Sequence, residues 1–83
     1  MANMTPSEAI TIRMKQLMKE RNNMTLYRLA LDSGIMHGTL NRIANNENKS
    51  VNFSTLIQIA NGFDMEVWEF LNSPLFKEEN LKL

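Results

Sequence analysis

The chain has 83 residues, 43% of them hydrophobic, which suffices for one modest core and a single domain. It contains no Cys, so disulfides and thiolate metal sites are excluded as sources of stability. The formal net charge at pH 7 is zero, which argues against a uniformly basic protein that coats nucleic acid regardless of sequence.

The charges are nonetheless unevenly distributed along the chain. Up to Ser50, seven basic and four acidic side chains leave a net charge of +3, whereas two basic and five acidic side chains after it leave −3. A positive half is what a surface that meets phosphates requires. Ordinary solvated charge gives the same distribution, so both interpretations stay open at this stage.

The first predicted helix begins after Thr5. Thr5 can cap the helix, Pro6 suits its first position, and Glu8 can complete a capping box. Apolar residues then recur at helical spacing as far as Met18, and the pattern is interrupted at residues 22–23, which are both Asn. This segment predicts a helix with one apolar face.

Two short helices follow, separated by a tight turn. Thr25 can cap the first of them, over 26–33, and Gly34 supplies the left-handed backbone conformation at which that helix ends. The second covers 37–45. Two short helices joined in this way pack at a steep angle, and the second can then enter the major groove of DNA, which is about 12 Å wide.

The second helix of this pair has an apolar stripe and a polar remainder. Its stripe is predicted from the spacing of Met36, Leu40, Ile43 and Ala44. The residues that fall outside the stripe are His37, Gly38, Thr39, Asn41, Arg42 and Asn45. These residues form the candidate binding surface.

The remainder of the chain predicts a loop and two further helices. Residues 45–50 contain no apolar side chain and indicate a surface loop. The most apolar helix of the chain follows, capped by Asn52 and starting at Phe53, and a last short helix over 67–71 ends before Pro74. Three further large apolar side chains are assigned to the core: Met14, Met18 and Trp68. We expect one domain over 1–76 and a tail over 77–83 that is frayed unless a partner orders it.

No arrangement of residues favours catalysis. One His, no Cys and widely spaced carboxylates provide no recognisable nucleophile, base or metal cluster, and so small a domain leaves little surface for a substrate cleft. No cofactor is expected. No stretch approaches the roughly 20 apolar residues of a membrane span. We therefore expect a protein that is not an enzyme. The absence of Cys and the seven Met residues favour a cytoplasmic location.

The segment 25–43 resembles the helix-turn-helix of the Cro and phage-repressor (XRE-type) family. Four dipeptides occur in the family's order and at its spacing: Leu29-Ala30, Gly34-Ile35, Thr39-Leu40 and Arg42-Ile43. The similarity continues through 54–60 and 67–71, and covers roughly residues 12–76. The resemblance implies a compact all-α bundle of about five helices, of the lambda-repressor-like type, that binds double-stranded DNA and regulates transcription.

The resemblance also implies which residues contact DNA. The family's base-facing positions match His37, Gly38, Thr39 and Arg42, and Asn41 lies beside them. Arg42 can donate two hydrogen bonds to guanine, and Gly38 lets the backbone approach the bases. Candidates for phosphate contacts flank this helix: Thr25, Tyr27, Arg28, Asn45 and Lys49. Two of these candidates have structural alternatives. Thr25 can instead cap a helix, and Tyr27 can instead cover the first helix.

Several positions depart from the family pattern. Leu26 stands where a phosphate-binding Gln is common, and Met36 where a Ser or Thr usually caps the third helix. A frequent Arg and Glu pair between the first and third helices is replaced by Met18 and Ala44. Losing both charges together is coherent, because an apolar contact can replace a buried ion pair without loss of stability.

Two function classes follow from the sequence. The first is a sequence-specific regulator, a repressor or a control protein of a mobile element, that binds a palindromic operator as a homodimer. Its dimer contacts would lie in the acidic C-terminal portion, although the same residues could simply close the monomer core: Trp68, Phe70, Leu75 and Phe76. The second is an antitoxin or antirepressor that retains the scaffold but has little affinity for DNA, which the zero net charge, Leu26 and Gly38 favour.

Overall fold

Five α-helices form the protein in a computed structural model that describes residues 4–47 and 51–83. They are α1 (Pro6–Glu20), α2 (Leu26–Ser33), α3 (His37–Ala44), α4 (Phe53–Gly62) and α5 (Val67–Leu71). Two short 3₁₀ helices, η1 (Pro74–Phe76) and η2 (Glu78–Asn80), follow, and the described ranges contain no strand. The prediction of an all-α fold with about five helices is confirmed.

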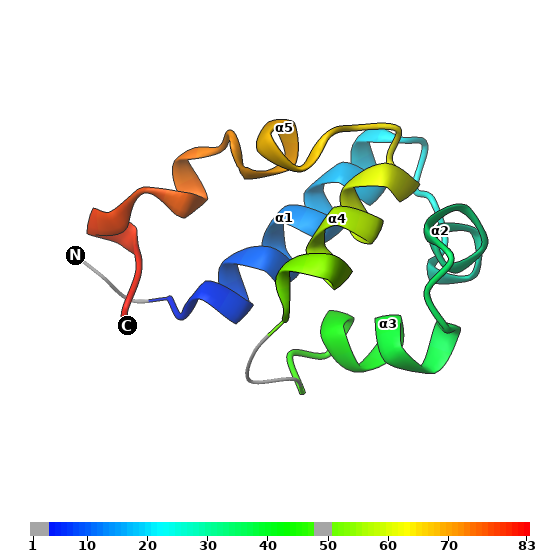
Figure 1. Cartoon of the computed structure of the whole chain (residues 1–83), viewed down its shortest axis with the longest axis horizontal. Helices are drawn as coiled ribbons and strands as arrows, with labels where there is room; N and C mark the ends of the chain where they lie inside the picture. Colours follow the sequence, from blue (N-terminus) through cyan, green and yellow to red (C-terminus); the bar gives the residue numbers. More distant parts are fainter. Residues whose placement is uncertain (1–3, 48–50) are drawn as a thin grey trace.

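The packing places α4 against both α2 and α5, while α3 packs against α2 and α1. Figure 1 shows α3 on one side of the molecule and α5 on the opposite side. None of the helices in the described part of the chain is long and apolar enough to cross a membrane.

Local signals set the helix ends as the sequence predicts. At the start of α1 the Glu8 amide donates to Thr5 Oγ1 at 3.2 Å, and the Thr5 amide donates to Glu8 Oε1 at 3.1 Å, which completes the capping box. After α1, Asn22 has a φ of 58° and Asn23 a φ of 57°. Asn tolerates this left-handed conformation better than most residues. At the start of α4, the Thr55 amide donates to Asn52 Oδ1 at 2.8 Å.

The core is filled from all five helices. Its largest fully buried side chains are Met14, Leu29, Leu40, Ile43, Ile59, Phe63 and Phe70. Gly62 of α4 lies tightly against α2, because a Cβ at this position would lie 2.8 Å from Leu29 Cδ1 and 2.9 Å from Ser33 Cβ. Any larger side chain would therefore push the two helices apart.

Two residues that the sequence assigns to the interior are exposed. Met36 is 79% exposed and Trp68 62%, so those two predictions are wrong. Met36 precedes the first turn of α3, where helical spacing does not yet apply. Trp68 lies two positions from the buried Phe70, and two positions are more than half a helical turn, so the two rings lie on opposite sides of α5.

The burial of Phe70 also corrects its proposed part in dimerisation. Its ring is fully buried, and Arg13 Nε donates to its carbonyl oxygen at 2.8 Å while the guanidinium carbon lies 5.9 Å from the ring centroid. Phe76 packs against it with ring centroids 6.2 Å apart. Phe70 therefore closes the monomer core and offers no surface to a second copy.

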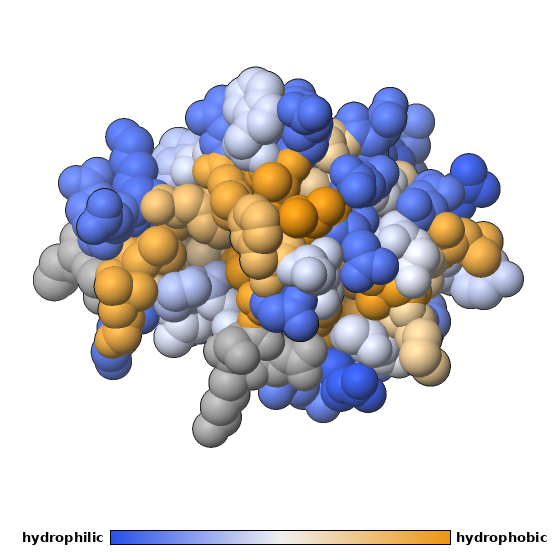
Figure 2. All heavy atoms as spheres, viewed as in Figure 1, coloured by the Kyte–Doolittle hydropathy of each residue, from blue (hydrophilic) through white to orange (hydrophobic). Residues whose placement is uncertain are grey.

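The segment after η1 turns back toward the start of the chain. Leu81 forms a parallel bridge with Met4, and the Lys82 amide donates to the Met4 carbonyl oxygen. Apolar side chains gather on the surface between α5 and α4 on the face that Figure 2 shows.

Candidate nucleic-acid interface

The turn between α2 and α3 is fixed by backbone conformation and hydrogen bonds. Thr25 caps α2 by accepting from the Arg28 amide at 3.1 Å, and Gly34 ends it with φ of 73°. The Ile35 amide donates to Ser33 Oγ at 3.2 Å, and the Ile35 side chain is buried. The predicted Thr25 cap and the predicted left-handed Gly34 are both present, and together they set the direction in which α3 leaves the turn.

The inner face of α3 is anchored in the core. Leu40, Ile43 and Ala44 are buried, with at most 7% of their surface exposed. Thr11 on α1 donates from Oγ1 to the Ile43 carbonyl oxygen at 2.7 Å in a buried hydrogen bond. The helix therefore cannot roll about its axis without breaking these contacts, and its opposite face has a fixed direction.

The outer face of α3 carries the predicted base-reading residues. Each residue of a helix is rotated by about 100° from the last, so Gly38 and Arg42 lie opposite the buried stripe, whereas Asn41 and Thr39 lie on its two flanks. Gly38, Asn41 and Arg42 are exposed, as is His37 at the start of the helix, whereas Thr39 is half-buried. Gly38 and Arg42 are therefore at the centre of the exposed face, with Asn41 and Thr39 at its edges.

Arg42 and Thr39 are linked on this surface. A terminal guanidinium nitrogen of Arg42 donates to Thr39 Oγ1 at 3.4 Å, across one helical turn. The contact is long and exposed to solvent, and it brings the guanidinium beside the Thr39 hydroxyl. Four of its donors remain for a ligand, because a guanidinium carries five N–H groups.

The first turn of α3 has no side-chain cap. Met36 occupies the N-cap position and makes no capping hydrogen bond, as its apolar side chain requires. The amide ends of a helix carry partial positive charge and attract phosphate. Gly38 adds to the open character of this end, because a Cβ placed there would meet no atom within 4 Å.

The residues predicted to contact phosphate differ in their hydrogen bonds and in their exposure to solvent. Thr25 uses its hydroxyl as a cap, and Arg28 Nε pairs with Asp32 Oδ2 at 3.1 Å. Tyr27 is 66% exposed, and Asn45 is exposed at the end of α3. Lys49 lies outside the described residues.

The apolar residues at positions 18, 26 and 44 leave no buried side-chain polar atom of the described residues without a partner. Ala44 is buried, and Met18 and Leu26 are partly buried against the core. Every buried side-chain nitrogen or oxygen within the described ranges has a hydrogen-bond partner. Apolar packing therefore replaces the polar contacts that these positions hold in the family pattern.

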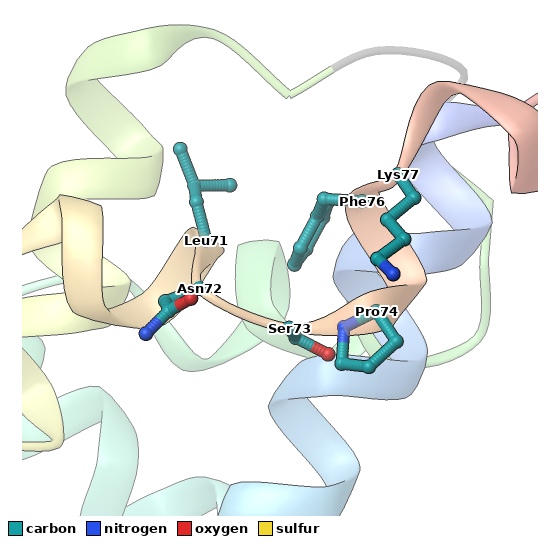
Figure 3. A pocket seen from close by; sticks show the side chains of 6 residues that line it. All are labelled: Leu71, Asn72, Ser73, Pro74, Phe76 and Lys77. Atoms are coloured by element: carbon teal, nitrogen blue, oxygen red, sulfur yellow. The ribbon is translucent and has the colours of Figure 1, made fainter.

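Among the described residues no group of three His, Cys, Asp or Glu side chains is arranged to hold a metal ion. An open hollow of about 350 Å³ lies where α5 meets η1, and Figure 3 shows its lining: Leu71, Asn72, Ser73, Pro74, Phe76 and Lys77. This lining contains no carboxylate, thiol or imidazole, so it offers neither a metal site nor a nucleophile with its base.

A family model described as a Cro/C1-type HTH DNA-binding domain matches residues 13–73. This range includes both helices of the motif, the turn between them and the two helices that complete the core. Neither the search of curated proteins nor the search of solved structures found a match. The resemblance drawn from the dipeptides of the helix-turn-helix is confirmed.

Proposed function

The chain belongs to the Cro/C1-type helix-turn-helix DNA-binding family, and we propose that it is a sequence-specific transcriptional regulator, a repressor or mobile-element control protein. Its operator is double-stranded DNA, read in the major groove by the outer face of α3. The observation that carries the proposal is the division of α3 into a buried apolar face and an exposed face that carries Arg42. A helix held in this way presents the same side chains to every site it meets.

Arg42 is the principal base reader in this proposal. Its planar guanidinium can donate two parallel hydrogen bonds to O6 and N7 of guanine. Thr39 orients it and offers a hydroxyl and a methyl group of its own. His37 and Asn41 supply further donors and acceptors, and Gly38 permits close approach of the backbone.

Phosphate contacts come from groups around this face. Tyr27, Arg28 and Asn45 are exposed near the two ends of the motif helices, and Lys49 follows in the chain. The uncapped first turn of α3 adds backbone amides. Arg28 would exchange Asp32 for a phosphate, a small cost because exposed pairs of this kind stabilise a protein by less than about 1 kcal/mol.

The operator is palindromic and bound by a homodimer in this proposal, since two-fold protein symmetry matches two half-sites. The contact surface is in the C-terminal portion, where Trp68 is 62% exposed and Leu75 and Phe76 are partly exposed. Ile57 and Val67 line an open hollow together with Trp68 and add apolar surface to this set. Phe70 is excluded from this set by its burial.

Selection of bound fragments from a random duplex pool tests the proposal. We expect a palindromic consensus whose half-sites are separated by one helical turn, about 34–36 Å. Affinity for the selected duplex should fall steeply with salt. The logarithm of the association constant, plotted against the logarithm of the salt concentration, should have a slope of about −0.9 for each phosphate contact. Absence of any duplex binding at low salt would contradict the proposal and favour an antitoxin or antirepressor on the same scaffold.

A further inference from the structure

Met36 is the most exposed large apolar side chain of the helix-turn-helix. It leaves 79% of its surface in solvent, against 66% for Tyr27 and 61% for Leu31. It also occupies the N-cap of α3 without making a capping hydrogen bond. The side chain thus contributes neither to the core nor to the cap, so its position needs another explanation.

Met36 adjoins the residues of α3 to which the proposed function assigns base reading. It directly precedes His37 and Gly38, at the end of the reading helix whose residues contact base edges in helix-turn-helix proteins. The space beside Gly38 is open, since no atom lies within 4 Å of the position of a Cβ. Gly38 therefore adds no side chain to this end of α3, and Met36 is itself mostly exposed to solvent.

We propose that Met36 is a specificity-determining residue that contacts the 5-methyl group of a thymine in the operator. The inference rests on the proposed function of α3 and names one base that it reads. Thymine is the base that presents a methyl group in the major groove. The flexible thioether chain of Met adapts well to an apolar partner of irregular shape. The contact removes both apolar surfaces from water.

The test is a scan of the selected operator in which each thymine is replaced in turn by deoxyuridine, which lacks the 5-methyl group. The measured quantity is the ratio of affinities for the thymine and uracil duplexes, taken separately for the original protein, Met36→Ala and Met36→Ser. A ratio within one variant cancels changes in folding and in phosphate binding. The original protein should lose about fourfold in affinity at one thymine of each half-site, the value for one buried methylene-sized group. Both variants should show a ratio near one at that position.

Two control variants separate Met36 from its neighbours. Thr39→Ser removes the other methyl group on this face and keeps the hydroxyl, and Leu31→Ala removes an exposed aliphatic side chain from α2. Both should retain the fourfold ratio. The inference is overturned if no thymine shows the effect, if Met36→Ala leaves the ratio unchanged, or if Thr39→Ser abolishes it. In each of these cases the proposed function still holds if the original protein binds some duplex sequences in preference to others. Failure of the original protein to prefer any duplex sequence overturns both.

Discussion

The two helices of the motif, α2 and α3, have eight residues each but are stabilised in different ways. Helix α2 has a side-chain cap from Thr25 at its start and a left-handed Gly34 at its end. Helix α3 begins at Met36 without a cap and carries Gly38 in its first turn. Both flank the same tight turn, so the difference lies in their own residues.

The comparison shows where α3 obtains its stability. A helix of eight residues is too short to persist alone, so packing must hold it. In α3 that packing comes from the inner face and from the Thr11 hydroxyl on the Ile43 carbonyl. Its first turn lacks the local signals that α2 has, as expected where residues are kept for a ligand at some cost in stability.

The largest expected effect comes from breaking the inner face of α3. Leu40→Ala removes a fully buried side chain and should lower the free energy of unfolding by about 2–5 kcal/mol. Urea denaturation monitored by circular dichroism measures the loss. Arg42→Ala, on the outer face, is the matched control and should change stability by less than about 0.5 kcal/mol. Equal losses for the two variants would contradict the division of α3 into two faces.

The next effect concerns the support that α2 receives from α4. Gly62→Ala places a methyl group against Leu29 and Ser33 at less than 3 Å, and overpacking of this kind costs about 1–3 kcal/mol. The midpoint of thermal unfolding should fall accordingly. An unchanged midpoint would mean that the two helices separate without cost.

Exchange of the caps tests the comparison directly. Thr25→Ala removes the cap of α2 and should cost about 1 kcal/mol, whereas Met36→Ser supplies one to α3 and should add about the same amount. Denaturant titrations of both variants measure the two changes. Changes of the same sign would show that the ends of the two helices do not differ in the way described.

The smallest expected change comes from the glycine of α3. Gly38→Ala meets no atom within 4 Å and should stabilise the protein by about 0.8–1.0 kcal/mol through helix propensity. The same methyl group would narrow the gap between backbone and DNA, so operator affinity should fall while stability rises. A loss of stability in the denaturant titration would be inconsistent with the open surroundings of Gly38.

The predictable parts of the fold depend on neighbours in the sequence. The capping box at Thr5 and the end of α2 at Gly34 involve residues at most four positions apart, and both match the structure. The set of residues on the outer face of α3 also follows from helical spacing. Helical spacing alone gave the wrong burial for Met36 and Trp68. Met36 is a cap residue outside the regular turns of α3, and α5 has only five residues, so the buried side is set by how the helices pack.

Contacts between distant segments could not be predicted in the same way. The close approach at Gly62 depends on Leu29, 33 residues earlier, and the hydrogen bond from Thr11 to Ile43 spans 32 residues. Nothing near either residue in the sequence indicates its partner. A Gly within an apolar helix and a Thr within an apolar stripe are the only signals, and both are weak.

The most direct test of the account is the base preference of variants at Arg42. Affinities for the selected operator and for a shuffled duplex should be measured for the original protein, Arg42→Ala, Arg42→Lys and Lys77→Ala, the last a control that removes a charge outside the motif. Arg42→Ala should lower the preference for the operator over the shuffled duplex by about 1–3 kcal/mol. Arg42→Lys should also lose this preference, because an ammonium cannot make the planar double contact with guanine. It should keep the salt dependence of affinity, because the positive charge remains. Unchanged preference in both Arg42 variants would contradict the claim that the outer face of α3 reads the bases.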